Sequence, residues 1–244
     1  MRVSWTIFVV SLVLSLISNA QRVYAQEDSD FEKQLWAMAL FNFRLDDKWG
    51  YNQDVAYQHL YDSPTFTRIF LRSQINRQLT GSVSVHGGLN LLYRFNEFDN
   101  DAIELRPWVG AKLRWPYFWR FNFSQYLRFE QRFEHTMNVN DWDNSFRVRY
   151  KISSNVPINH ESIVDETLYG VLAYEFFSSS FADDVRFTTA ATHRFDLGIG
   201  YRQNIKNRFE ATVVALKSLS DDNDHYSLSS GVLFLKYKRY INWE

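Results

Sequence analysis

The amino-acid sequence predicts an all-β fold: a single antiparallel transmembrane β-barrel of about 10–12 strands that follows a cleaved signal peptide. Three observations support this prediction. Long stretches alternate between apolar and polar residues, aromatic residues make up 18% of the chain, and the mean hydropathy is nevertheless negative. A bundle of membrane helices would need a far more hydrophobic sequence. Strands that are apolar on one face only account for all three observations.

The composition excludes several classes of protein. The chain has 244 residues, which is enough for one large domain with a substantial core. Its 27 basic and 28 acidic residues nearly cancel, whereas nucleic-acid binding needs a clustered basic excess. The chain has no cysteine, so disulfide scaffolds, thiol catalysis and cysteine-ligated zinc are excluded.

Residues 1–25 have the pattern of a secretory signal peptide. Arg2 supplies the positive charge, and residues 6–18 form a short apolar core. The segment ends at Ala25, a small residue of the kind that signal peptidase requires, and Ala20 is an alternative cleavage site. The apolar core is too short to span a membrane comfortably. We therefore expect export and removal of this segment.

Residues 119–133 show the period of two most clearly. One face carries Trp119, Phe121, Phe123, Gln125, Leu127, Phe129, Gln131 and Phe133. The other carries Arg120, Asn122, Ser124, Tyr126, Arg128, Glu130 and Arg132. A helix would distribute these residues around its axis, whereas a strand separates them onto two faces. This segment therefore predicts a strand with one apolar and one charged face.

The same alternation recurs throughout residues 26–244, which we expect to form one outer-membrane barrel domain. Further clear strands are predicted at residues 65–79, 81–95, 105–117, 146–152 and 194–202, and weaker ones at 31–45, 51–61, 167–177, 206–217 and 226–238. Bacterial single-chain barrels have even strand numbers, so these eleven segments leave two explanations. Either a strand is undetected, or residues 31–45 are not an ordinary wall strand. We expect ten or twelve strands, and prefer twelve.

The predicted connections alternate in length, which is typical of outer-membrane barrels. Tight links are expected at residues 80–81, 115–117 and 203–206, and longer polar ones at 96–101, 135–144, 178–184 and 218–225. The link at 153–166 is long where a short turn is expected. Pro107 lies inside a predicted strand and requires a bulge there, because it lacks a backbone N–H.

Closing the sheet with its apolar face toward lipid pairs every backbone group and leaves a polar lumen. Six tryptophans lie near predicted strand ends, where interfacial aromatic girdles form: Trp36, Trp49, Trp108, Trp115, Trp119 and Trp142. The alternative is a soluble periplasmic barrel or sandwich that acts as a binding module. The final strand departs from the usual barrel-assembly signal, because Arg239 interrupts its alternation and Glu244 replaces a terminal aromatic residue.

Short motifs between residues 103 and 151 carry a family resemblance. They are Glu104-Leu105-Arg106-Pro107-Trp108, Leu127-Arg128-Phe129-Glu130-Gln131-Arg132-Phe133 and Phe146-Arg147-Val148-Arg149-Tyr150, and the opening Trp36…Lys48-Trp49 is similar too. In these motifs the chain resembles the DUF2490 family of uncharacterised bacterial outer-membrane proteins. The resemblance implies a signal-bearing outer-membrane barrel and no known activity.

The polar faces of the predicted strands are strongly basic. Their basic residues are Arg68, Arg72, Arg94, Arg106, Lys112, Arg114, Arg120, Arg128, Arg132, Arg147, Arg149, Arg194 and Arg202, and their acidic residues are Glu104, Glu130 and Asp196. One interpretation is a network of ion pairs that fills a narrow lumen. The other is a lumen that attracts anions. Glu32, Asp46 or Asp47 could supply missing countercharge.

An outer-membrane lipid-modifying hydrolase is the enzymatic alternative. It needs a serine nucleophile and a histidine base on the wall that faces lipid. His86 is close to Ser82 and Ser84 but on the predicted lumen face, and His225 is followed by Ser227. The chain has no His-x-Ser-Asn-Gly stretch of the phospholipase type. We therefore assign no catalytic residue and expect a protein that is not an enzyme.

The remaining expectations concern ligands and partners. The acidic stretches 138–144 and 221–224 lack the glycine and distal glutamate of an EF-hand loop, so we expect no metal and no cofactor. The expected partners are outer-membrane lipid, lipopolysaccharide, the barrel assembly machinery and small anionic solutes. The sequence predicts a Gram-negative outer-membrane protein that is a narrow anion-favouring pore or a structural component of the membrane.

Overall fold

The computed structural model describes residues 32–61, 66–96, 100–138, 141–181, 190–219 and 226–242. The predicted signal peptide lies outside these residues. The strands are β1 (Glu32–Arg44), β2 (Trp49–Leu60), β3 (Phe66–Gln78), β4 (Val83–Asn96), β5 (Ala102–Arg114), β6 (Asn122–Thr136), β7 (Asp141–Pro157), β8 (Thr167–Phe181), β9 (Ala190–Arg202), β10 (Asn207–Leu219) and β11 (Tyr226–Ile241). Within the described part of the chain, no helix is long and apolar enough to cross a membrane.

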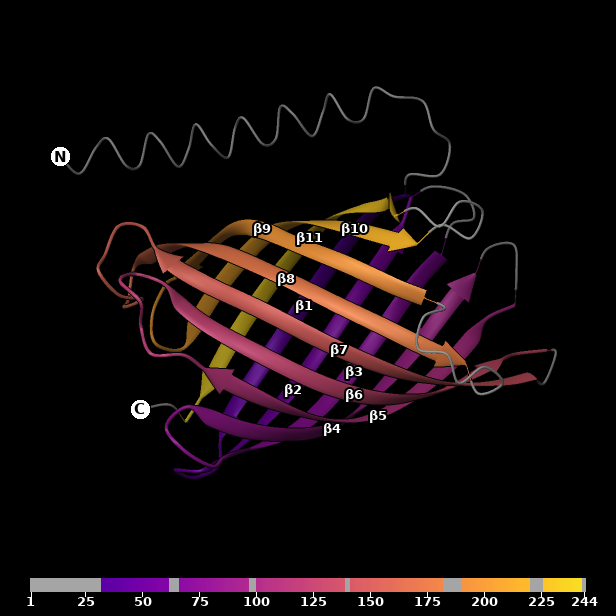
Figure 1. The fold of residues 1–244 in the computed structure, drawn as a ribbon, viewed down its shortest axis with the longest axis horizontal. Coiled ribbons are helices and arrows are strands. Elements are labelled where there is room, and N and C mark those ends of the chain that lie inside the picture. The colour runs from indigo at the N-terminus through magenta and orange to yellow at the C-terminus, as the bar shows by residue number, and fades with distance from the viewer. Residues whose placement is uncertain are drawn as a thin grey trace, which may run out of the picture. The chain divides into compact units, whose positions relative to one another are not determined.

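The strands form one closed barrel in which each is hydrogen-bonded to the next along the chain (Figure 1). The all-β barrel fold is therefore confirmed. Among the described residues eleven strands close the sheet, which agrees with the predicted range of about 10–12 and with the eleven segments identified from the sequence. Only the preference for an even number, ten or twelve, is wrong. The segment that we questioned, at residues 31–45, supplies the complete wall strand β1.

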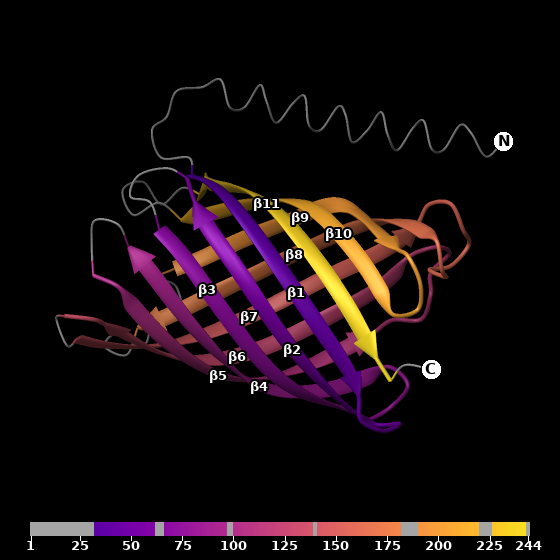
Figure 2. The ribbon, with the colours of Figure 1, turned by 180° about the vertical axis from the view of Figure 1, so that it is seen from behind.

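Closure with an odd number of strands has a geometric consequence. Neighbours along the chain run antiparallel, so the first and last strands of an odd set run in the same direction. β1 and β11 accordingly pair in parallel, from Glu32 opposite Ser230 to Phe43 opposite Ile241. Figure 2 shows these two strands side by side in the wall. β1 therefore has an antiparallel neighbour on one side and a parallel one on the other.

The barrel has two rims: β1 begins at the N-terminal rim, and β11 ends at the C-terminal rim. At the C-terminal rim, where β11 ends, the links are residues 45–48, 79–82, 115–121, 158–166 and 203–206. At the N-terminal rim, where β1 begins, strands β2, β4, β6, β8 and β10 end. The tight links predicted at 80–81 and 203–206 lie at the C-terminal rim, and the long link before β8 is the predicted exception there. The tight link predicted at 115–117 is wrong, because residues 115–121 separate β5 from β6.

One of the longer links predicted from the sequence is wrong. The stretch 135–144, predicted as a loop, is mostly strand: His135 on β6 pairs with Trp142 on β7, and only residues 137–140 intervene. The expected bulge at Pro107 is also absent. Pro107 pairs with Leu89 on β4, and the ladder to β6 is interrupted at residues 106 and 107 without a register shift. The missing N–H of proline leaves this local gap.

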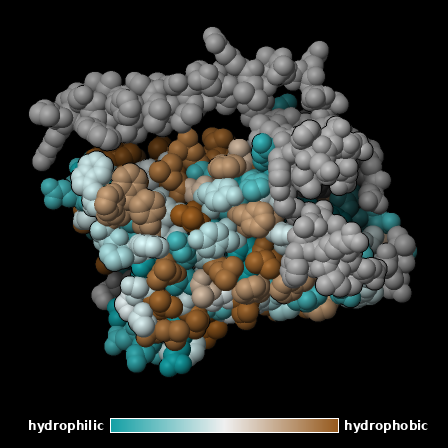
Figure 3. All heavy atoms as spheres, in the orientation of Figure 1, coloured by the Kyte–Doolittle hydropathy of each residue, from teal (hydrophilic) through white to brown (hydrophobic). Residues whose placement is uncertain are grey.

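The wall has a polar inner face and an apolar outer face. On β4, Ser84 and Asn90 are buried inside, whereas Val85, Leu89 and Leu91 are exposed outside. Brown, hydrophobic side chains are spread over the outer wall in Figure 3. This arrangement is the reverse of a soluble barrel, which buries its apolar face.

The tryptophans divide between the two faces. Trp49, Trp115, Trp119 and Trp142 are exposed. Trp49, Trp115 and Trp142 lie at or next to strand ends, and Trp119 lies in the link between β5 and β6. The girdle position predicted for Trp36 and Trp108 is wrong, because both lie on the inner face. Trp108 is buried, and Trp36 packs edge-on against Phe234 with ring centroids 5.4 Å apart. Alternation along the strand determines their side, whatever their distance from the strand end.

An apolar cluster lines the inner face beside the closing seam. It consists of Val214, Val232 and Phe234 from β10 and β11, packed against Trp36, Met38 and Leu216. Val214 and Val232 are almost fully buried. The interior is therefore apolar next to the parallel strand pair, although most of it is charged.

Glycines on the inner face make room for aromatic rings. The rings of Trp108, Tyr126 and Tyr169 lie over Gly88, Gly110 and Gly200 of the neighbouring strands, where a Cβ atom would collide with them. Each ring can lie flat against the wall because its neighbour has no side chain. The glycines therefore set how far large side chains extend into the lumen.

We predict that Gly200→Ala destabilises the barrel by about 1–3 kcal/mol, because the added methyl group overlaps the ring of Tyr169. Gly170→Ala on β8 is the matched control. Its Cβ would meet only the carbonyl oxygen of Val156, at 3.9 Å. The measurement is the urea midpoint of the refolded barrel, and equal midpoints for the two variants would contradict the proposed ring packing.

Candidate functional site in the barrel lumen

The predicted charge network lies mainly on the inner faces of β3 to β7. Arg68 and Arg72 come from β3, Arg94 from β4, Glu104, Arg106 and Arg114 from β5, Arg128, Glu130 and Arg132 from β6, and Arg147 and Arg149 from β7. The assignment of Arg120 to a strand is wrong, because β6 begins only at Asn122. Arg120 lies in the link before β6 and donates to the carbonyl of His160 at 2.9 Å.

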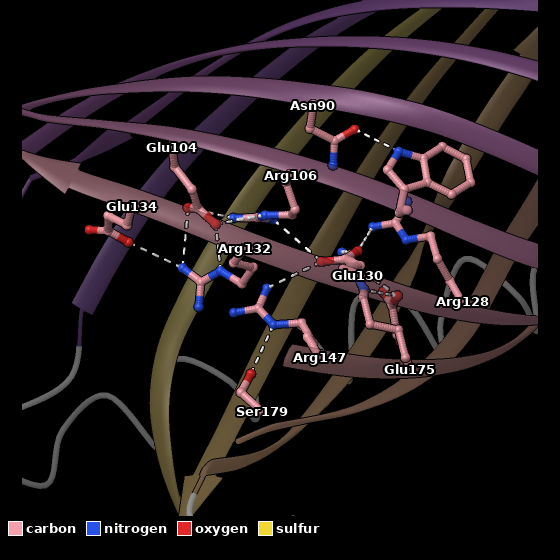
Figure 4. Close-up of polar contacts among 12 residues, drawn as sticks. Asn90, Glu104, Arg106, Arg128, Glu130, Arg132, Glu134, Arg147, Glu175 and Ser179 are labelled. Carbon is pink, nitrogen blue, oxygen red and sulfur yellow. Dashed lines mark hydrogen bonds and ion pairs between the residues drawn. The ribbon is translucent and has the colours of Figure 1, made fainter. Parts of the chain in front are cut away.

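Glu130 is the centre of the network and is fully buried. Its carboxylate forms an ion pair with Arg128 on its own strand. Three further guanidinium groups lie around it: Arg149 at 3.3 Å, Arg106 at 3.7 Å and Arg147 at 3.9 Å. Figure 4 shows Arg106, Arg128 and Arg147 converging on Glu130 from β5, β6 and β7. One carboxylate thus serves four cations, so its removal would leave all four under-compensated.

A second acidic centre, Glu104, extends the network toward the N-terminal rim. Arg106 donates to its two oxygens at 2.8 and 2.7 Å, and the Nε of Arg132 donates at 2.5 Å. Arg132 also reaches Glu134 at 3.4 Å, and Glu134 pairs with Arg94 at 2.9 Å. The ion pairs therefore continue from the buried middle of the lumen along the inner wall (Figure 4).

Four acidic residues of the lumen were not identified from the sequence. Asp54 pairs with Arg72, Glu175 with Arg149 at 2.7 Å, and Glu134 with Arg94 as above. Glu210 accepts from Lys238 at 2.5 Å and from the Tyr169 hydroxyl at 2.9 Å. Three of them lie in the segments of weakest alternation, and Glu134 lies just beyond the predicted end of its strand. Assigning an inner face to those weak strands would have revealed them.

Glu32, Asp46 and Asp47 were predicted to balance the positive charge of the lumen, but they make other contacts. The Asp46 carboxylate accepts the backbone N–H groups of Lys48 and Trp49, both at 2.7 Å, and these bonds lower the pKa of Asp46. Asp47 pairs with Arg44 and is 92% exposed. Glu32 accepts from the hydroxyl of Ser230 at 3.0 Å, next to the closing seam. None of these contacts joins the central network.

Aromatic groups complete the packing of the middle of the lumen. The guanidinium of Arg128 lies over the Trp108 ring at 4.8 Å, and the indole N–H of Trp108 donates to Asn90 at 2.9 Å. On the other side, Arg194 lies over Trp36 at 5.1 Å. Interior residues on most strands are buried at this level: Ala56, Asn90, Trp108, Arg128, Glu130, Glu175, Arg194, Asp196, Val214, Val232 and Phe234. Side chains from most strands are therefore packed against one another in the middle of the lumen.

The structure brings one serine–histidine pair together. The Ser84 hydroxyl lies 2.9 Å from Nε2 of His86, and the Gln74 amide lies 3.0 Å from Nδ1. Catalytic activation of serine uses a carboxylate where Gln74 stands, and the pair lies inside the barrel rather than on its outer wall. The other candidate, His225, falls outside the described residues.

The described residues hold no group of three or more His, Cys, Asp or Glu side chains that could bind a metal ion. Their fold and interior define a closed β-barrel with an apolar outer wall and an ion-paired lumen. The chain matches the family described as a protein of unknown function (DUF2490) over residues 33–225, and it belongs to that family. No curated protein matches it.

We predict that Glu130→Gln costs about 3–5 kcal/mol of unfolding free energy, because buried arginines lose their shared counterion. Glu161→Gln makes the same chemical change at an exposed position in the link before β8 and should cost less than about 0.5 kcal/mol. Urea titrations followed by tryptophan fluorescence give both values. Similar losses in the two variants would show that Glu130 does not hold the network together.

Proposed function

We propose that this protein is an outer-membrane β-barrel of a Gram-negative bacterium, with an occluded and positively biased lumen. The observation that carries the proposal is the distribution of apolar surface. Large hydrophobic side chains point outward and stay exposed along the wall; Val109, Val213 and Phe195, on three different strands, are 61%, 52% and 50% exposed. Exposure of so much apolar surface to water is energetically unfavourable, whereas contact with lipid hydrocarbon is not.

The interior supports the same proposal over a soluble periplasmic barrel. A soluble ligand-binding barrel commonly holds its ligand in an interior lined by apolar side chains. Here the central interior positions carry Glu104, Arg106, Arg128 and Glu130, all buried and ion-paired. We therefore propose outer-membrane lipid and lipopolysaccharide as the surroundings of the wall, with insertion by the barrel assembly machinery.

The packed middle of the lumen favours a structural membrane component over an open porin. A narrow anion pathway is the second candidate, and a specific observation favours it: lysines and arginines outnumber carboxylates on the described inner face, even with the four additional acids. A positive lumen favours anions. We propose no enzymatic role, because the third group beside Ser84 and His86 is the neutral amide of Gln74.

The membrane proposal predicts recovery of the protein with the outer-membrane fraction of expressing cells. The purified protein should also migrate differently before and after boiling on a detergent gel, because a closed barrel resists detergent unfolding. Inner-membrane proteins and periplasmic markers in the same fractions serve as controls. Recovery in the detergent-free periplasmic extract, with no change on boiling, would overturn the proposal.

The occluded lumen gives a second prediction. In planar bilayers the wild-type barrel should show no steady conductance, whereas Trp108→Ala should produce small anion-favouring steps, because it empties space in the buried middle of the lumen. Trp115→Ala removes an exposed ring just beyond β5 and should behave like wild type. Large steady openings of the wild-type protein would refute the occlusion and support the pore.

A further inference from the structure

Near the C-terminal rim, the lumen contains a cation that the ion-pair network does not include. Lys112 lies on the inner face of β5, opposite Ser84 on β4 and Tyr126 on β6. Within the described part of the chain its ammonium group makes no ion pair and no hydrogen bond. In the middle of the lumen, by contrast, Arg106, Arg128 and Arg149 each contact a carboxylate.

The charges around Lys112 are also positive. Arg114, Lys238 and Lys151 are the charged groups that act on it most strongly. Arg114 follows two positions along the same face, and its guanidinium donates to the neutral amide of Gln78 at 2.9 Å. Lys238 is already held by Glu210 at 2.5 Å. Glu210 is thus already engaged by another cation, and neither Lys112 nor Arg114 has a carboxylate partner among the described residues.

Such a charge pair is unfavourable unless something compensates it. Like charges on one strand face repel, and a cation in a confined space with low-dielectric walls loses much of its hydration. The same walls concentrate the field and attract a mobile anion. Two of the neighbouring inner positions carry short polar side chains, Ser84 and Ser124, and a third carries Tyr126. Ser124 on β6 is hydrogen-bonded to Ser153 on β7 at 3.0 Å.

We propose that Lys112 and Arg114 form a binding site for a small oxyanion, such as phosphate or a carboxylate, at the C-terminal rim of the lumen. The ammonium supplies a point charge and up to three donors, and the guanidinium supplies a planar pair of donors that matches an oxyanion. Arg114 is exposed and Lys112 lies deeper, so the anion enters from the rim and meets Arg114 first. The site needs a closed barrel but no conduction through it.

The test uses the purified barrel, shown to be folded by its gel shift on boiling, in low-salt buffer without phosphate. Inorganic phosphate and, in a separate experiment, the dicarboxylate succinate are titrated calorimetrically, and the thermal midpoint is recorded at each concentration. Wild-type protein should bind phosphate and gain stability with it. Lys112→Met should weaken binding at least about tenfold, equivalent to about 1.4 kcal/mol, and should raise the midpoint in the absence of phosphate because repulsion is relieved.

The matched control is Lys48→Met, which removes an exposed lysine from the turn between β1 and β2 at the same rim and should leave phosphate binding unchanged. Arg114→Gln provides a second variant at an exposed position if Lys112→Met fails to fold, and it too should weaken binding. The proposal is overturned if wild-type protein binds neither phosphate nor succinate, or if the lumen variants bind as wild type does. These results are independent of membrane fractionation and of conductance, so they can fail while the proposed function stands.

Discussion

The parallel pairing of β1 with β11 is the contact on which the rest of the barrel depends. An open sheet would leave the N–H and C=O groups of two edge strands unpaired, and that is untenable in the lipid surroundings that we propose. Eleven strands close only if the first and last run in the same direction, and the register from Glu32 opposite Ser230 onward achieves this. The apolar cluster around Val232 and Phe234 lies directly inside this seam. Packing of side chains therefore supports the one strand pair that differs from all the others.

Closure of the barrel also brings many positive charges together in the lumen, where carboxylates compensate them. Once the apolar faces turn outward, the arginine-rich faces of β3 to β7 are brought together in a narrow space. Glu104 and Glu130 are shared among several guanidinium groups there, and acids from β2, β8 and β10 contribute from the remaining wall. Replacing a network of this kind with apolar groups is not always destabilising, but removing one partner is. Each shared carboxylate therefore stabilises several arginines at once, so the ion pairs of the interior depend on one another.

The distribution of these contacts along the barrel separates two regions. In the middle, ion pairs, Trp108 and the seam cluster fill the lumen with buried side chains. Toward the C-terminal rim, Lys112 and Arg114 lack carboxylate partners in the described structure, and the short side chains of Ser84 and Ser124 lie next to them. Buried side chains in the middle, with two cations at one rim that have no carboxylate partner, suit a protein that holds an anion better than one that conducts freely. The packing of the middle of the lumen thus supports the occluded barrel that we propose.

The sequence by itself determined the two faces of the strands, since a period of two assigns each side chain to one face wherever the pattern is strong. Residues from Arg68 to Arg149 were placed in the lumen on this basis, and all except Arg120 lie on strands of the inner wall. Only the tertiary structure decided the closing pair, the inward position of Trp36, and the acids Asp54, Glu175 and Glu210. The reason is physical: alternation is a local property, whereas closure, register and the partner of a buried charge depend on strands far apart in the chain. Where the alternation is weak, only pairing with neighbouring strands defines which face is inside.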